Sequence, residues 1–279
     1  MGGSYSGGWF RRWQAEDGRE AGTVPSPPKG QVLTAAASKD GRWIVHGDEQ
    51  VVVVRNTTTL QQVLRVREHA GRVDGVDVSP DSTRFASVSS DQTLRVFDII
   101  TGKRLLGPLQ HGQWLTAVRF SPSGEYIATA SNSSRAWVWN ASTGSLLCEI
   151  DRSSVVSWSH APLAWSSDSK RLFFVTSEGK VTCHDVPTSN VVQEWLLLID
   201  NIKYCSLATN GRFVACTTPI SLSFWDTCSY SRIGLPIEVE GGIYGIALSP
   251  DGSRFAAGGR GKITVYTLEN VLAQLGASI

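Results

Sequence analysis

The amino-acid sequence predicts an all-β protein made of repeated four-stranded sheets. Two landmarks support this prediction: a residue pair that ends one strand of each repeat, and a turn motif that recurs in step with it. A third observation is that short apolar strands alternate with turns along nearly the whole chain. A fixed period of roughly 20 to 50 residues decides the architecture of a chain before any local pattern does.

The first landmark is the residue pair at the end of the third strand of each repeat. Its second members are spaced by 42, 42, 42, 45, 41 and 41 residues. The pairs are Trp13-Gln14, Arg55-Asn56, Phe97-Asp98, Trp139-Asn140, His184-Asp185, Trp225-Asp226 and Tyr266-Thr267. This spacing predicts equivalent third strands in all seven places.

The second landmark is a turn between the first and second strands. Pro presets φ at the first central position of a turn, and Asp, Asn and Gly tolerate the conformations that follow. The turns are Ser38-Lys39-Asp40-Gly41, Ser79-Pro80-Asp81-Ser82, Ser121-Pro122-Ser123-Gly124, Ser166-Ser167-Asp168-Ser169, Ala208-Thr209-Asn210-Gly211 and Ser249-Pro250-Asp251-Gly252. One four-stranded sheet cannot bury both of its faces alone, and radial packing of sheets supplies the missing partner. The sequence therefore predicts a β-propeller of four-stranded blades.

The stretch from His69 to Asp98 carries the most complete pattern. It reads His-x-x-x-Val-x-x-Val-x-Val-Ser-Pro-Asp, followed by Phe-Ala-Ser-Val-Ser-x-Asp-x-Thr-Leu-Arg-Val-Phe-Asp. This pattern resembles the tryptophan-aspartate (WD) repeat family, and through the two landmarks the likeness extends over nearly the whole chain. The resemblance implies a propeller whose inner strands and adjoining turns meet partners.

The resemblance also implies a buried hydrogen-bond chain in each blade. In the family it joins a His before the first strand, a Ser or Thr in the second strand, an Asp in the next turn and a Trp in the third strand. His69, Ser87 and Asp91 match three of these places, but Phe97 stands at the Trp place and has no N–H to donate.

Other repeats match this chain less completely. The resemblance gives the next repeat His111, Thr129 and Trp139, with Ser133 in the place of the Asp. It gives a later repeat the motif pair Trp225 and Asp226. His184 stands at a Trp place and Pro219 at an Asp place, so we expect apolar packing to hold those blades together.

Residues 1–279 are expected to form a single propeller domain. Trp9 to Trp13 and Arg19 to Val24 read as third and fourth strands, so residues 1–24 predict a half blade and residues 25–279 six full repeats with a tail. The tail is long enough for one outer strand or a short helix from Asn270 to Leu275. Six or seven blade positions are both compatible with this count, and we favour seven with one incomplete blade. The missing inner strands suggest a piece of a longer protein or a gap that a partner covers.

Composition sets limits on partners and compartment. Lys and Arg number 26 against 25 Asp and Glu, so net charge indicates neither a nucleic-acid partner nor an anionic membrane. The first residues lack a secretory signal pattern, and no apolar stretch is long enough to span a bilayer. The five cysteines contain no Cys-x-x-Cys pair and lie mostly in apolar runs, which favours a reducing compartment.

A search for reactive groups predicts no catalytic site, no metal site and no cofactor. Cys183, His184 and Asp185 are consecutive, but neighbours on a strand point to opposite faces, and the repeat places His184 in the core. His46 and His160 have no ligand at metal spacing. The glycine-rich stretch 258–262 lacks the spacing of a phosphate loop and precedes a strand, so it reads as a tight turn.

The resemblance places partner contacts on the first strands and the turns beside them. Residues two apart on a strand lie on the same side of it. The inner positions chosen in this way carry side chains of both charges and two aromatic side chains. The predicted partner-binding residues are Arg72, Asp74, Trp114, Lys203, Tyr244 and Arg260. Trp and Tyr often anchor interfaces. The alternative is that Trp114 caps the core and the charges are ordinary solvated surface.

The resemblance implies a non-catalytic scaffold or adaptor for protein or peptide partners. We expect a monomeric propeller within a larger assembly, in the cytoplasm or alternatively the nucleus, with no specific nucleic acid and no membrane. One alternative is the sensor or regulatory end of a larger signalling protein. A propeller enzyme such as a lactonase would need several acidic or His side chains at the inner positions, where only Asp48 and Asp74 occur.

Overall fold

The computed structural model describes most of the residues of the chain. They are residues 9–14, 19–25, 32–132, 135–151, 163–175, 180–186, 188–196, 205–209, 212–218, 220–239, 242–243, 245–249, 253–259 and 262–274. They form two compact units, Met1–Phe120 with Ser142–Gly144, and Ser121–Ala141 with Ser145–Ile279.

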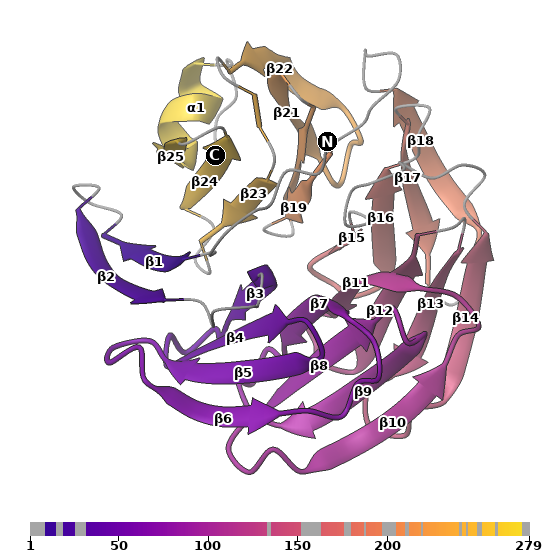
Figure 1. The fold of residues 1–279 in the computed structure, drawn as a ribbon. Helices are drawn as coiled ribbons and strands as arrows, with labels where there is room; N and C mark the ends of the chain where they lie inside the picture. Colours follow the sequence, from indigo (N-terminus) through magenta and orange to yellow (C-terminus); the bar gives the residue numbers. More distant parts are fainter. Residues whose placement is uncertain are drawn as a thin grey trace, which may run out of the picture. The chain divides into compact units, whose positions relative to one another are not determined.

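Unit 1 contains one two-stranded and two four-stranded antiparallel sheets (Figure 1). The two-stranded sheet pairs β1 (Trp9–Trp13) with β2 (Glu20–Pro25). The first four-stranded sheet has β3 (Val32–Ala37), β4 (Trp43–Asp48), β5 (Val51–Asn56) and β6 (Gln62–Val66) in that order. The second has β7 (Val73–Val78), β8 (Arg84–Ser89), β9 (Thr93–Asp98) and β10 (Arg104–Gln110). Strand β11 (Leu115–Phe120) completes the unit.

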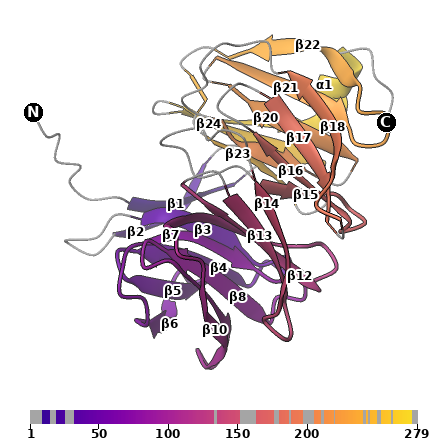
Figure 2. The same ribbon diagram turned by 90° about the vertical axis from the view of Figure 1, so that its right-hand side faces the viewer.

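Unit 2 continues the same pattern (Figure 2). The sheet order β11-β12-β13-β14 includes β12 (Tyr126–Ser131), β13 (Arg135–Asn140) and β14 (Leu146–Asp151). The next sheet has β15 (Leu163–Trp165), β16 (Arg171–Val175), β17 (Lys180–Asp185) and β18 (Val191–Leu196). It is followed by β19 (Leu207–Thr209), β20 (Phe213–Thr217), β21 (Ser221–Asp226) and β22 (Arg232–Glu238). A three-stranded sheet of β23 (Gly245–Leu248), β24 (Arg254–Gly259) and β25 (Lys262–Thr267) leads into helix α1 (Leu268–Gln274).

The predicted all-β fold of propeller blades is confirmed. Within each unit the first strands of successive sheets lie side by side: β3 beside β7 and β7 beside β11, then β15 beside β19 and β19 beside β23. The last described sheet has three strands followed by α1, so of the two predicted endings the helix is the one that forms. The single domain and the seven blade positions stay predictions.

Burial explains why these sequences form inner and outer strands. Second and third strands such as β8 and β9 are buried along most of their length, because both faces of their sheet are covered. Fourth strands such as β14 and β18 are mostly exposed. Phe85 of β8 and Phe97 of β9 are fully buried and stacked, with ring centroids 5.1 Å apart. They belong to the apolar core of unit 1.

The turn landmark is closed by its serine side chain. The backbone N–H five residues later donates to the serine Oγ in the pairs Trp43 to Ser38, Arg84 to Ser79, Tyr126 to Ser121, Arg171 to Ser166 and Arg254 to Ser249. The fourth turn residue has a positive φ at Gly41, Ser82, Gly124 and Ser169. A glycine adopts this conformation without strain, and serine takes it at two of the turns.

Both of these positive-φ serines link neighbouring turns. Ser82 Oγ accepts a hydrogen bond from the backbone N–H of Asp40 at 3.2 Å in unit 1. Ser169 Oγ accepts one from Ser123 N–H at 2.9 Å in unit 2. Each hydroxyl therefore joins the turn of its own sheet to the turn of the preceding sheet.

The buried side chain of His46 in β4 predicts a pH-dependent stability. Burial lowers the pKa of His46 to about 4, and the Arg55 guanidinium acts in the same direction. A histidine in the unfolded chain titrates near about 6.5. Between about pH 6.5 and pH 4 the unfolded chain binds a proton that the folded chain does not, so stability falls as the pH falls through that window. We expect His46 to account for a loss of about 3 kcal/mol by pH 4.

Urea unfolding at about pH 7 and pH 4.5 checks this expectation. His111 also has its pKa lowered to about 4 by burial, so His46→Gln should reduce the pH dependence without abolishing it. An equal loss of stability on acidification in the wild type and in His46→Gln would contradict the assignment.

Candidate partner-binding site

The side chains of Arg72, Asp74 and Trp114 meet where two inner strands begin, and together they are called the Arg72–Trp114 surface below. Arg72 immediately precedes β7, and Trp114 immediately precedes the adjacent β11. The backbone of Arg72 is fixed from its other side by Ser90. The Ser90 N–H donates to the Arg72 carbonyl at 2.9 Å, and the Arg72 N–H donates to Ser90 Oγ at 2.9 Å.

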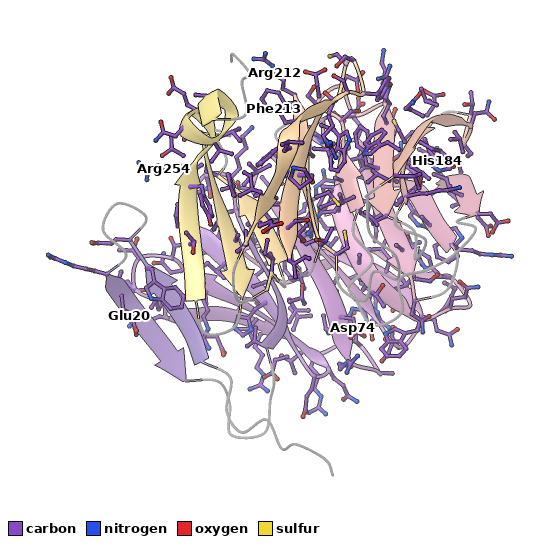
Figure 3. The ribbon with its side chains drawn as sticks, turned by 90° about the horizontal axis from the view of Figure 1, so that it is seen from above. Glu20, Asp74, His184, Arg212, Phe213 and Arg254 are labelled. Carbon is purple, nitrogen blue, oxygen red and sulfur yellow. The ribbon has the colours of Figure 1, made fainter. Side chains whose placement is uncertain are left out.

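Asp74, which is labelled in Figure 3, connects the other two residues of this surface through its hydrogen bonds. Its side chain is 2% exposed. Arg72 Nε donates to Asp74 Oδ1 at 2.8 Å, and the Trp114 indole N–H donates to Asp74 Oδ2 at 2.7 Å. The Arg72 guanidinium carbon lies 5.2 Å from the centroid of the Trp114 ring, within the range of a cation–π contact. A buried carboxylate thus holds an arginine against a tryptophan.

Arg72 and Trp114 remain open to solvent. The Arg72 side chain is 48% exposed and Trp114 is 38% exposed. Trp and Arg are the residue types that most often dominate binding energy at interfaces, because each combines a large flat contact area with directed hydrogen-bond donors. The arrangement can therefore bind a partner side chain with little loss of rotamer freedom.

Three of the predicted partner-binding residues lie outside the described residues. They are Lys203, Tyr244 and Arg260. Their part in a binding face stays a prediction, as does that of Arg72, Asp74 and Trp114.

His69, Ser87 and Asp91 form a buried hydrogen-bond network in the β7–β10 sheet. His69 Nε2 lies 2.8 Å from Ser87 Oγ, and His69 Nδ1 lies 2.9 Å from Asp91 Oδ2. Asp91 also accepts from Thr93 Oγ1 at 2.6 Å and from the backbone N–H groups of Thr93 and Ala70 at 3.0 and 2.9 Å. Burial alone would raise the pKa of Asp91, but the hydrogen bonds from His69 and Thr93 hold it far below its usual value.

The other residues that the family resemblance assigned to the blade interiors have varied surroundings. The Trp139 indole N–H donates to Thr129 Oγ1 at 3.2 Å. His111 Nδ1 lies 3.0 Å from the carbonyl oxygen of Leu109. Trp225 is buried in the apolar core of unit 2. Asp226 Oδ1 accepts backbone N–H groups from Cys228 and Ser229 at 2.9 and 2.8 Å, which caps the turn into β22. The structural role of these residues stays a prediction.

Cys183, His184 and Asp185 do not form a reactive set within the described sheet. Burial raises the pKa of Cys183 to about 11, so its thiol is protonated at neutral pH. His184 is buried against Phe174, with ring centroids 4.9 Å apart, and its Nδ1 lies 3.2 Å from the carbonyl oxygen of Ser189 (Figure 3). Cys183 and His184 are neighbours on β17, so their side chains point to opposite faces.

The described residues contain neither a candidate metal-ion site nor a candidate membrane-spanning helix. No group of three or more His, Cys, Asp or Glu side chains there is arranged to hold a metal ion. None of the helices found in the described part of the chain has the length and apolar character needed to cross a membrane.

The contact between Asp74 and Trp114 is the feature that sequence reasoning missed. The sequence placed Arg72 and Asp74 on one side of a strand by their spacing of two, which is the signal for their ion pair. Trp114 lies 40 residues from Asp74, so only the packing of β11 against β7 brings the indole N–H to the carboxylate. The closing role of the landmark serines was also missed, although the shared Ser at the first position of five turns was a signal for it.

Comparison with known proteins identifies the repeats. Residues 60–98 and 103–140 match the family model "WD domain, G-beta repeat". The chain is 24% identical over 267 residues to the periodic tryptophan protein 2 homolog of Dictyostelium discoideum, covering 85% of this chain and 28% of that protein. It is 25% identical over 170 residues to WD repeat-containing protein 1 of Mus musculus, covering 60% of this chain and 28% of that protein.

A shorter match reaches higher identity. The U4/U6 small nuclear ribonucleoprotein PRP4 of Saccharomyces cerevisiae is 34% identical over 109 residues, covering 37% of this chain and 22% of that protein. The chain thus spans less than a third of the length of these relatives. The resemblance found in the residues from His69 to Asp98 is confirmed.

Proposed function

We propose that this chain, which is built from propeller blades and in which residues 60–98 and 103–140 match the WD-repeat family model, is a non-catalytic scaffold or adaptor that holds protein or peptide partners. The observation that carries the proposal is the Arg72–Trp114 surface, where a buried Asp74 fixes two half-exposed side chains of the types that anchor interfaces. Fold alone does not assign a function, so the proposal depends on this surface.

The relatives support a role in assemblies. The name of one of them, U4/U6 small nuclear ribonucleoprotein PRP4, places that protein in a ribonucleoprotein particle. We propose that the present chain likewise acts inside a larger protein assembly, as a monomeric propeller, in the cytoplasm or in the nucleus. The residues 1–279 are proposed to act as one domain.

A second candidate is a regulatory propeller within a larger signalling protein. A propeller enzyme is the weakest candidate, because Asp74, one of the two carboxylates expected at the inner positions, already accepts hydrogen bonds from Arg72 and Trp114 on its two oxygens.

Replacing Trp114 by alanine should remove at least about nine tenths of the native partner captured from a lysate, since a central aromatic anchor contributes about 2 kcal/mol or more to binding. The measurement is affinity purification with quantitative mass spectrometry, comparing the wild type with Trp114→Ala and with the double variant Trp114→Ala, Tyr244→Ala. Trp13→Ala is the matched control, because Trp13 is 43% exposed and lies at the end of β1.

Equal thermal unfolding midpoints for the variants and the wild type make the comparison valid. The same partners captured in the same amounts by Trp114→Ala and by Trp13→Ala would show that this surface is not the binding face.

A further inference from the structure

Arg72 presents one edge of its guanidinium to solvent in a fixed orientation. Its Nε is bound to Asp74, and its plane lies near the Trp114 ring. Among the residues that the structure describes, none accepts a hydrogen bond from the two terminal nitrogens of Arg72. These nitrogens form the side of the guanidinium that matches the two oxygens of a carboxylate or a phosphate.

The accessible edge of the Arg72 guanidinium suits a ligand group that carries one negative charge. Asp74 is buried and shared between Arg72 and Trp114, so its carboxylate faces inward and leaves the outer edge of Arg72 to solvent. Two other arginines of the same sheet already have an acidic partner: Arg95 and Arg104 both bind Glu68, at 3.2 and 2.7 Å. One accessible guanidinium therefore matches a carboxylate better than a phosphate, whose charge near neutral pH is about −2.

The fixed orientation of Arg72 reduces the conformational entropy that is lost when a partner binds. An arginine loses rotamer freedom when it is immobilised at an interface, and this loss normally opposes binding. Here the hydrogen bond from Nε to Asp74 and the position of the guanidinium over the Trp114 ring already restrict the side chain. Trp114 adds an apolar surface beside the guanidinium, on which an apolar side chain next to the acidic residue can pack.

We propose that the Arg72–Trp114 surface binds the side chain of an Asp or Glu in an extended peptide of a partner protein, with an adjacent apolar residue against Trp114. This inference rests on the proposed scaffold function and names the chemistry of its partner. Arg72 acts as the specificity-determining residue, and Asp74 acts as a positioning residue through it.

Selection from a random peptide library displayed on phage tests the proposal directly. The wild type should enrich peptides with Asp or Glu at one position next to an apolar residue. A synthetic peptide of the enriched sequence should then bind at least about tenfold more weakly to Arg72→Gln, as should the same peptide with its acidic residue replaced by Gln or Asn. The two losses should not add, because they remove the same contact. Arg72→Lys should also weaken binding, since an ammonium cannot form the two-pronged contact.

Arg119→Gln is the matched control. The side chain of Arg119 in β11 is 49% exposed, against 48% for Arg72, and its Nη1 lies 3.9 Å from Asp77 Oδ1. Peptide affinity should be unchanged in Arg119→Gln.

Three outcomes would overturn the proposal: enriched peptides without an acidic residue, an acidic preference that persists in Arg72→Gln, or binding only when the acidic residue is replaced by phosphoserine. The scaffold function would survive each of them if Trp114→Ala still abolished capture of the native partner. If the acidic preference did not depend on Arg72 and Trp114→Ala still captured the native partner, neither the acidic-peptide proposal nor the scaffold surface would be correct.

Discussion

Replacing Asp91 by alanine should lower the free energy of unfolding by about 3 to 5 kcal/mol, because several buried hydrogen-bond donors lose their shared acceptor. The substitution removes an acceptor from His69 Nδ1, Thr93 Oγ1 and two backbone N–H groups at once. It also leaves the buried side chain of His69, which contacts Ser87, without the carboxylate of Asp91. Unsatisfied buried polar groups account for most of the expected loss.

Urea unfolding followed by fluorescence measures this loss. Asp98→Ala is the control, because Asp98 caps an exposed turn and should cost only about 1 kcal/mol. The hydrogen bonds to Asp91 hold its pKa far below the usual value, so its stabilising contribution is complete above the unfolded-state pKa of about 4 and is lost as the pH falls below it. The gap between wild type and Asp91→Ala should therefore be constant above about pH 5 and shrink on further acidification. A gap that widens toward acid pH would contradict this role.

Replacing Phe97 by alanine should cost about 3 to 5 kcal/mol, because a fully buried ring is removed and the cavity is only partly refilled. Phe97 stacks on Phe85 and lies in the core of unit 1. Phe97→Leu keeps much of the volume and should cost clearly less. Leu105→Ala, on an exposed strand of the same sheet, should change stability by less than about 0.5 kcal/mol.

Differential scanning calorimetry separates these three variants. If Phe97→Ala and Leu105→Ala lowered the unfolding midpoint equally, the β7–β10 sheet would not depend on its aromatic pair.

The sequence was sufficient to predict the fold because its landmarks are local. Each turn motif and each third-strand pair specifies a chain reversal within a few residues, so strands such as β8 and β24 begin just after their turn motifs. The hairpin of β1 and β2 also forms close to its predicted bounds. The short helix was predicted over residues 270–275 and is α1, Leu268–Gln274.

Contacts between sheets could not be predicted in the same way. The approach of Trp114 to Asp74 depends on how β11 packs beside β7, and no residue pattern within either strand encodes that distance. Local periodicity gives the face of a strand on which a side chain lies, whereas the neighbour across that face is set by tertiary packing.

The serine-closed turns have a consequence for how this chain can change over evolutionary time. Because the Oγ atoms of Ser79 and Ser166 bind backbone groups, the chain reversal does not depend on which apolar residues fill the strands that follow. Val, Ile, Ala and Phe can then be exchanged in those strands as long as the total side-chain volume of the core is kept. A protein built in this way can diverge far in its interior while a few hydroxyl groups preserve the alignment of its strands.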